Sequence, residues 1–205
     1  MVERQLKARG IIEPQVLDAF RAVPREAFVE PHYAHLAYAD HPLPIDAGQT
    51  ISQPYIVALM VQAAALETND VVLEVGAGSG YAAAVISRIA DRVIAVERLP
   101  VLVDAAKRRM RDLGYHNVTV VEGDGTRGWA ELAPFDAILV AASGSHVPES
   151  LVAQLRSPGR LIMPIGGEGS VQKLVRIMKQ TDDSVQRSDL GAVRFVPLIG
   201  EEGWR

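Results

Sequence analysis

The first candidate for chemistry is a glycine-rich stretch, Glu74-Val75-Gly76-Ala77-Gly78-Ser79-Gly80. It directly follows an apolar run, so it marks the turn between a buried strand and a helix. Glycine permits a tight turn and lets the backbone approach a ligand closely, while the N-terminus of the following helix faces that ligand. The stretch is therefore a candidate binding loop for a nucleotide-like cofactor.

The spacing of these glycines indicates which cofactor fits. Dinucleotide-binding proteins carry the pattern G-x-G-x-x-G. Here the glycines lie at positions 76, 78 and 80, and Tyr81 occupies the place of the third glycine. This spacing argues against a nicotinamide dehydrogenase. It fits a loop that receives a methionine moiety and a ribose, so we predict S-adenosylmethionine as the cofactor and S-adenosylhomocysteine as its product.

Two acids further along the chain fit the same cofactor. Glu97 ends the second predicted strand, where its carboxylate can accept both ribose hydroxyls, and Asp124 ends the third, where it can accept the adenine amino group. Carboxylates also suit a cationic sulfonium. The alternative, that these acids only cap helices, is disfavoured by three strand ends in register. The predicted cofactor-binding residues are Gln53, Glu74, Gly76, Ala77, Gly78, Ser79, Gly80, Glu97, Arg98, Asp124 and Gly125.

Several other kinds of site are disfavoured. The chain has no cysteine, which excludes a disulfide, a thiolate zinc site and a cysteine nucleophile. His32, His35, Asp40 and His41 lie close in sequence, but no His-Glu-x-x-His pattern accompanies them, so we predict no metal. A serine hydrolase is equally disfavoured, because the pattern Gly-x-Ser-x-Gly is absent.

The length and the charge of the chain restrict the classes of protein that remain possible. A chain of 205 residues suits one α/β domain with a modest addition. The formal net charge is −4 and no cluster of Lys and Arg stands out, so nucleic acid is a poor candidate partner. The N-terminus lacks the apolar core of a signal peptide, and no apolar run approaches the ~20 residues that span a bilayer. We expect a cytoplasmic protein that binds no membrane, and a monomer.

An alternation of apolar runs and amphipathic segments must position these residues. We expect strands at residues 71–75, 92–97, 118–121, 135–141 and 160–164, and helices at 81–89, 100–113 and 148–155. Two later runs, 173–178 and 192–196, are predicted strands that no full helix separates. Apolar strands alternating with helices indicate a parallel sheet covered on both faces. The predicted fold class is α/β, a Rossmann-like doubly wound methyltransferase sheet, mostly parallel with an antiparallel C-terminal edge.

The N-terminal quarter has a different pattern. Apolar positions with a helical period predict a helix that follows Pro14 and is stopped by Pro24. Residues 28–49 hold three prolines and are predicted to be irregular, and 53–66 is predicted to form an amphipathic helix with Pro54 in its first turn. We therefore expect residues 1–52 to form an N-terminal helical cap and substrate-side segment of the same domain. Residues 53–205 are the expected cofactor-binding core.

With Gly48-Gln49-Thr50-Ile51-Ser52-Gln53-Pro54-Tyr55 as the most specific element, the sequence resembles, over nearly its whole length, the protein-L-isoaspartate (D-aspartate) O-methyltransferases. The glycine loop is shared by many methyltransferases, whereas the segment around Thr50-Ile51-Ser52 and the ending Arg194-Phe195-Val196-Pro197-Leu198 are nearly diagnostic together. The segment 141–146 departs from the threonine- and alanine-rich form common in the family. It also lacks the polar–Pro–Pro–aromatic motif of base-amino methyltransferases. The matching segments are 48–55, 72–81, 123–125, 135–138 and 193–198.

The resemblance implies methylation of the α-carboxylate of L-isoaspartyl residues, and less efficiently of D-aspartyl residues, in damaged proteins and peptides. The methyl ester then collapses to a succinimide, whose hydrolysis returns some normal aspartate, so the enzyme starts a repair. By the same resemblance Ser52 is the catalytic residue and orients the substrate carboxylate, with Thr50 assisting. The implied substrate-binding residues are Thr50, Ile51, Ser52, Val193 and Arg194.

The chemistry of this transfer requires few side chains. A carboxyl group with a pKa of ~3.9 is already ionised at pH 7 and needs no general base. Alignment of the reacting atoms and removal of water remain, and short hydroxyl side chains suit that task.

Other interpretations stay open. Residues 50–52 also suit an N-cap for the next helix, and 193–194 an ordinary edge strand with a solvated arginine. A carboxyl methyltransferase dedicated to one modified peptide is one rival function, and a non-catalytic cofactor-binding protein is another.

Overall fold

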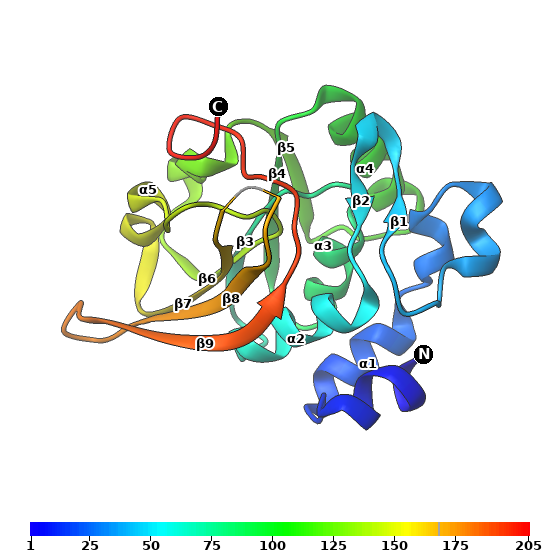
Figure 1. The fold of residues 1–205 in the computed structure, drawn as a ribbon, viewed down its shortest axis with the longest axis horizontal. Helices are drawn as coiled ribbons and strands as arrows, with labels where there is room; N and C mark the ends of the chain where they lie inside the picture. Colours follow the sequence, from blue (N-terminus) through cyan, green and yellow to red (C-terminus); the bar gives the residue numbers. More distant parts are fainter. Residues whose placement is uncertain (168) are drawn as a thin grey trace.

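The computed structural model describes residues 1–167 and 169–205. Its centre is a seven-stranded sheet with the order β5-β4-β3-β6-β7-β8-β9 (Figure 1). The strands are β3 (Val71–Val75), β4 (Arg92–Glu97), β5 (Val118–Glu122), β6 (Phe135–Val140), β7 (Leu155–Ile165), β8 (Gln172–Lys179) and β9 (Val185–Val193).

The direction of these strands agrees with the sequence prediction. Strands β3 to β7 pair in parallel with one another, whereas β8 pairs antiparallel with both β7 and β9. The predicted α/β class, with a mostly parallel sheet and an antiparallel C-terminal edge, is therefore confirmed. Because the parallel strands all end at one edge, the loops that follow β3, β4, β5 and β6 lie close together.

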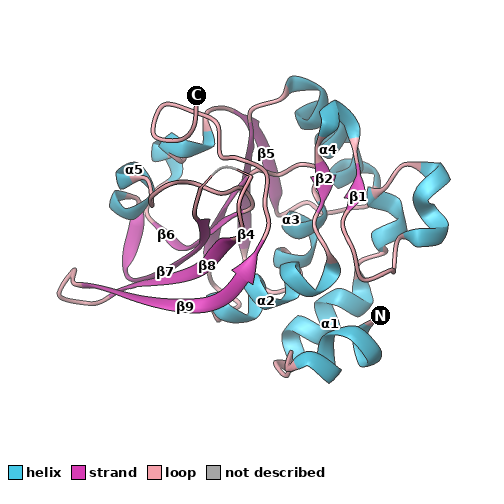
Figure 2. Cartoon of the chain, viewed as in Figure 1, coloured by secondary structure: helices cyan, strands magenta, loops and turns pink. Residues whose placement is uncertain are grey.

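Five α-helices accompany the sheet in the described part of the chain (Figure 2). Proline occupies the first turn of α1, α2 and α4, where its missing N–H costs no hydrogen bond. Helices α3 and α5 are shorter than predicted, and no helix in the described residues is long and apolar enough to cross a membrane. The helices are α1 (Pro14–Ala22), α2 (Pro54–Ala64), α3 (Tyr81–Ile86), α4 (Pro100–Asp112) and α5 (Glu149–Ala153).

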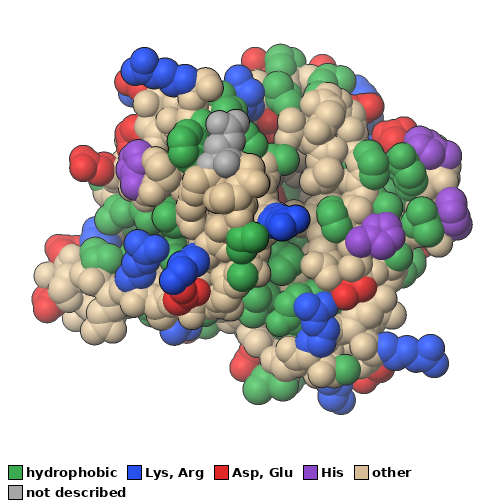
Figure 3. All heavy atoms as spheres, in the orientation of Figure 1, with side chains coloured by type: hydrophobic (Ala, Val, Ile, Leu, Met, Phe, Trp, Pro, Cys, Tyr) green, Lys and Arg blue, Asp and Glu red, His purple; other side chains and the backbone are tan. Residues whose placement is uncertain are grey.

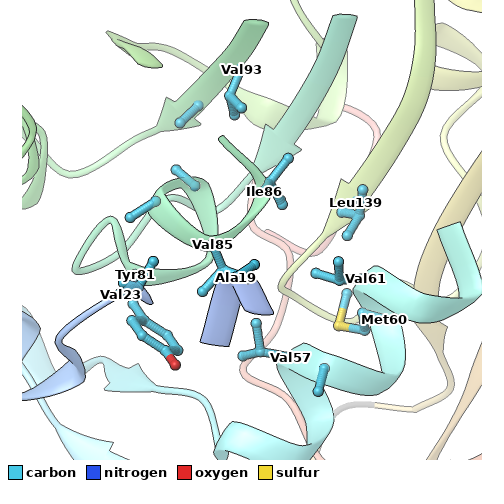
Figure 4. Packing of buried hydrophobic residues seen from close by; sticks show 14 of the residues in the cluster. Ala19, Val23, Val57, Met60, Val61, Tyr81, Val85, Ile86, Val93 and Leu139 are labelled. Atoms are coloured by element: carbon cyan, nitrogen blue, oxygen red, sulfur yellow. The ribbon is translucent and has the colours of Figure 1, made fainter. Parts of the chain in front are cut away.

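The two faces of the sheet bury two separate apolar clusters. Side chains alternate along a strand, so Val72 of β3 belongs to one cluster and Leu73 to the other. Helices α1 to α4 contribute to the first cluster, in which Met60 and Val61 of α2 lie beside Leu139 of β6 (Figure 4). Helix α5 and the C-terminal residues pack on the second. The sheet is thus covered on both faces, as predicted.

The N-terminal region packs against this core beside α2 and α3 (Figure 1). Its predicted irregular stretch, 28–49, contains short ordered pieces, among them the 3₁₀-helices Pro31–Leu36 and Asp46–Gly48. Strand β1 (Leu43–Pro44) pairs antiparallel with β2 (Thr50–Ile51), which leads directly into α2. This small two-stranded sheet fixes the backbone of the segment that the sequence assigned to the substrate.

The last strand corrects one prediction. Residues 192–196 were expected as a strand, but β9 runs from Val185 to Val193 and the chain then leaves the sheet. The Phe195 N–H donates to the Gln172 side chain at 2.9 Å, and the Val196 carbonyl accepts from Ser143 N–H at 2.8 Å. In residues 195–196, hydrogen bonds to a side chain and to a loop thus take the place of hydrogen bonds to a neighbouring strand. Residues 196–204, here named the C-terminal strap, cross the ends of the central strands.

Candidate active site

A cavity of about 360 Å³ lies at the carboxyl ends of the parallel strands. Its walls come from the glycine loop after β3, the end of β4, the residues after β6, the segment 48–52, helix α2 and the C-terminal strap. Ligands of open α/β sheets bind at this edge, where the strand order reverses on either side of β3. The cavity is therefore the candidate active site.

The structure brings most of the predicted site residues to this cavity. The residues that line it are Thr50, Ile51, Ser52, Glu74, Gly76, Ala77, Gly78, Ser79, Glu97, Arg98 and Gly125. The residues outside its lining are Gln53, Gly80, Asp124, Val193 and Arg194.

The three glycines of the loop have different tasks. Gly76 and Gly78 line the cavity, and Gly76 adopts a φ of 89° that favours glycine. Gly80, with a φ of 87°, caps α3, and a Cβ there would lie 2.7 Å from Met110 Cε of α4. The third glycine thus lets α3 and α4 pack closely, and only the first two line the cavity.

Backbone amides hold the Glu97 carboxylate at the end of β4. Gly78 N–H donates to Oε2 at 3.0 Å, while Arg98 and Leu99 N–H donate to Oε1 at 2.8 and 3.0 Å. The side chain is oriented by the glycine loop itself and lines the cavity. Each carboxylate oxygen has further lone pairs, so Glu97 can accept ribose hydroxyls without losing these contacts.

Glu74 is a buried acid without a full set of partners. Its side chain is fully buried at the end of β3, and its Oε2 has no hydrogen-bond partner. Burial raises the pKa of Glu74 well above its usual range, the nearby Glu97 charge raises it further, and the Ala83 amide offsets this only partly. A buried orphan carboxyl oxygen in a cavity wall is suited to a cationic ligand.

Asp124 is engaged within the protein. Its Oδ1 accepts from Thr126 N–H at 2.9 Å and from the Thr126 hydroxyl at 2.7 Å, and its Oδ2 accepts from Glu201 N–H at 2.7 Å. Burial alone would raise the pKa of Asp124, but these hydrogen bonds outweigh it and lower the pKa. Asp124 thus fastens the C-terminal strap, and its neighbour Gly125 lines the cavity.

The segment Thr50-Ile51-Ser52 forms part of the cavity wall. Ile51 is buried in the first apolar cluster, Ser52 is half-buried, and both line the cavity. The N-cap of α2 is Gln53, without a side-chain capping hydrogen bond, and the Gln53 amide instead donates to the Asp40 carbonyl at 3.0 Å. The alternative that Ser52 is the helix cap therefore fails, and its hydroxyl is not used for capping.

The sequence prediction missed the cavity residues of the strap. Val193 ends β9 and Arg194 is exposed, whereas Val196, Pro197, Leu198 and Ile199 line the cavity. The signal was present, because residues 196–198 belong to the same near-diagnostic ending. The prediction took its residues from the expected strand, two to three positions before the part of that ending that lines the cavity.

The divergent segment after β6 anchors this strap. Ser143 O accepts from Leu198 N–H at 2.8 Å and from the Trp204 indole N–H at 2.9 Å, and the Ser143 N–H donates to Val196 O. Glu202 accepts from Ser150 N–H at 3.1 Å. The departure from the family pattern thus falls on residues that hold the strap by backbone contacts, which depend little on side-chain identity.

The cavity fits S-adenosylmethionine by its donor set. The glycine cradle admits a close backbone approach, Glu97 offers acceptors for a ribose, and Glu74 provides a carboxyl for a cation. Met60, Val61 and Leu139 supply apolar walls. In the described part of the chain no group of three or more His, Asp or Glu side chains is placed to hold a metal. Fold and site define an S-adenosylmethionine-dependent methyltransferase.

Comparison with known proteins identifies the family. A model of protein-L-isoaspartate(D-aspartate) O-methyltransferase (PCMT) matches residues 1–203. A protein-L-isoaspartate O-methyltransferase of Rhodopseudomonas palustris is 57% identical, covering 100% of this chain and 94% of the relative. One from Protochlamydia amoebophila is 52% identical, covering 100% and 98%. The chain belongs to the protein-L-isoaspartate(D-aspartate) O-methyltransferase family.

Solved structures agree with this assignment. A protein-L-isoaspartate O-methyltransferase superposes with a TM-score of 0.88 at 32% identity, covering 99% of this chain and 67% of that chain. A beta-aspartate methyltransferase (PCMT) from Plasmodium falciparum, in complex with S-adenosyl-L-homocysteine, superposes with a TM-score of 0.82 at 29% identity, covering 97% and 96%. The predicted family, enzyme class and cofactor are confirmed.

Proposed function

We propose that the cavity carries out the family's reaction, methyl transfer to the α-carboxylate of L-isoaspartyl residues in damaged proteins and peptides, with Ser52 as the catalytic residue. The observation that carries this proposal is the placement of Thr50-Ile51-Ser52 on the wall of the cavity that also contains the glycine loop. The acceptor carboxylate can therefore meet the methyl donor inside one cavity. D-aspartyl residues are a weaker proposed substrate.

The cofactor side of the cavity is assigned to the strand ends. Gly76 and Gly78 would cradle the methionine part, Glu97 would accept the ribose hydroxyls, and Glu74 would face positive charge. The strap residues Leu198 and Ile199 offer apolar contacts at the adenine end, next to Gly125. Asp124 supports that end by holding the strap, so we assign it an indirect role in place of a direct contact with the adenine amino group.

The chemistry needs alignment more than acid–base groups. When bound, S-adenosylmethionine supplies a methyl group that a carboxylate oxygen can attack while the C–S bonding electrons leave on sulfur. The Ser52 hydroxyl donates a hydrogen bond that orients the acceptor carboxylate. Ile51 and the strap exclude water from it. A carboxylate is already ionised at neutral pH, so no residue has to accept a proton.

Two further expectations stay predictions. The monomeric state is tested by the molar mass from light scattering, and the cytoplasmic location by fractionation of cells that produce the protein. On the face shown in Figure 3, Lys and Arg are interspersed with Asp and Glu.

A pair of peptides tests the function. The protein is incubated with labelled S-adenosylmethionine and two peptides that differ only in an aspartyl or an isoaspartyl linkage. We expect label in the isoaspartyl peptide alone. Equal labelling of both peptides would contradict the proposal. Absent labelling with intact cofactor binding would favour one of the two rivals, an enzyme dedicated to one modified peptide or a non-catalytic binding protein.

A further inference from the structure

Arg25 is a buried cation that the reaction described above does not use. It begins the 3₁₀-helix Arg25–Phe28, and its side chain has 0% relative exposure. Among the described residues no carboxylate pairs with it, and its Nη1 has no hydrogen-bond partner. Burial lowers the pKa of Arg25, but a guanidinium remains charged at neutral pH. Because a buried charge without a counter-charge is costly, its presence calls for a reason.

The contacts of Arg25 join the two sides of the active site. Its Nη2 donates to the Ser52 carbonyl at 2.9 Å, and its Nε donates to the Ala37 carbonyl at 2.7 Å. The guanidinium lies over the ring of Tyr81, 4.7 Å from the ring centroid. Ser52 and Tyr81 both line the cavity, and Tyr81 is the first residue of α3 after the glycine loop. One side chain thus holds the proposed catalytic segment against the cofactor loop.

The charge of Arg25 matches a need of the cavity. The charged residues that line the cavity are Glu74, Glu97 and Arg98, of which the two acids are buried and Arg98 is exposed. Any acid of this wall that is ionised attracts a cationic cofactor but repels an acceptor carboxylate. A cation directly behind Ser52 offsets this repulsion on the acceptor's side of the cavity, where the low dielectric strengthens its effect.

We propose that Arg25 is a positioning residue for the methyl acceptor: its fork fixes the Ser52 backbone, and its buried charge favours binding of the substrate carboxylate. This inference rests on the proposed role of the Thr50–Ser52 segment. Arg25 acts through Ser52 and through its field, since it does not itself line the cavity. The effect of the charge can be separated from that of the fork, which is the planar set of N–H donors of the guanidinium. Lysine retains the positive charge but has no such set of donors.

The test compares Arg25→Met, which removes charge and fork, with Arg25→Lys, which keeps the charge. The control Arg21→Met removes the same kind of side chain from exposed ion pairs on α1. Measured are kcat and KM for the isoaspartyl peptide, and the Kd of S-adenosylhomocysteine by calorimetry. We expect Arg25→Met to raise KM about tenfold and to lower kcat about tenfold, the scale of a charge-assisted hydrogen bond. Arg25→Lys should restore KM but not kcat, with every Kd within about twofold of the wild-type value.

The outcomes separate this inference from the proposed function. If the wild-type protein does not methylate the isoaspartyl peptide, the proposed function is contradicted, and the variants need not be compared. With an active wild type, unchanged kcat and KM in Arg25→Met would overturn the role of Arg25. A parallel loss of S-adenosylhomocysteine binding would reduce Arg25 to a purely structural residue and would overturn it as well. If Arg25→Met does not fold, Arg25→Lys serves as the test. A kcat equal to that of the wild type in Arg25→Lys would contradict the role of the guanidinium fork.

Discussion

At the scale of single residues, Ser52 is the side chain on which the proposed reaction depends most directly. We expect Ser52→Ala to lower kcat for the isoaspartyl peptide about tenfold to a hundredfold, because it removes a hydrogen bond to a charged group. The Kd of S-adenosylhomocysteine should change by less than about twofold. Ser145→Ala, which alters an exposed serine, is the matched control. A collapse of cofactor binding in Ser52→Ala would make Ser52 a cofactor ligand first.

Glu74 makes the stability of the cofactor-free protein depend on pH. Burial raises its pKa in the folded state above the unfolded value of ~4.3, so the folded protein binds the additional proton. The free energy of unfolding therefore falls as the pH rises above ~4.3 toward the folded-state pKa. Glu74→Gln should remove this decline and raise the melting temperature by a few degrees at pH 8, but not at pH 4. Thermal unfolding of both proteins across this pH range provides the measurement.

The substitution Glu74→Gln should also weaken binding of the cofactor. Glu74→Gln exchanges an ionisable carboxyl for a neutral amide, so we expect the affinity for S-adenosylmethionine to fall about tenfold. A variant that is more stable and binds as tightly as the wild type would show that Glu74 has only a structural role.

The position of a single residue in the cavity could be predicted where it depends on neighbours close in the sequence. The 76–78 spacing and the strand-end position of Glu97 are local features, and both residues of the cradle lie in the cavity. One of the contacts of Asp124 comes from Glu201, 77 residues away. No local pattern reveals such a partner, because a loop that returns across the sheet leaves no periodic signal.

At the scale of elements, Arg160 ties several of them together. From β7 its guanidinium donates to Ala64 O at 2.6 Å and Ala65 O at 2.8 Å at the end of α2, and it pairs with buried Asp70 before β3. We expect Arg160→Met to destabilise the protein by about 3–5 kcal/mol, since it leaves the buried Asp70 carboxylate without a counter-charge. Arg156→Met, which breaks a more exposed pair with Asp136, should cost less than about 1 kcal/mol. Urea unfolding measures both, and equal losses would contradict this assignment.

Elements were predictable in proportion to their burial. Strands β3 and β4 have the predicted bounds, because both are apolar runs buried on both faces and are followed by glycine or polar residues. Strand β9 was misplaced because it is an exposed edge strand, and its residues Val185–Asp189 are mostly polar. The apolar residues just after it pack on the end of the sheet and on the cavity. An apolar run there indicates burial, but not a strand.

At the scale of the whole molecule, cofactor binding should couple to global stability. The cavity joins the N-terminal region, the glycine loop and the C-terminal strap, so a ligand there opposes unfolding of all three. S-adenosylhomocysteine at one hundred times its Kd should add about 2.7 kcal/mol, which corresponds to about 5–10 °C in melting temperature for a chain of this size. NAD at the same concentration is the control. An equal shift with NAD would contradict the cofactor assignment.

The recessed position of Ser52 also bears on which targets can be restored. Ile51 is buried and Ser52 half-buried, so a damaged residue has to extend away from its own fold to bring its carboxylate to Ser52. Termini and loops of folded proteins open at almost no free-energy cost, whereas core residues open only with global unfolding. We therefore expect the pace of repair at each damaged position to follow the local opening equilibrium of the target. Rigid, long-lived proteins would then accumulate lesions in their interiors while their mobile segments are renewed.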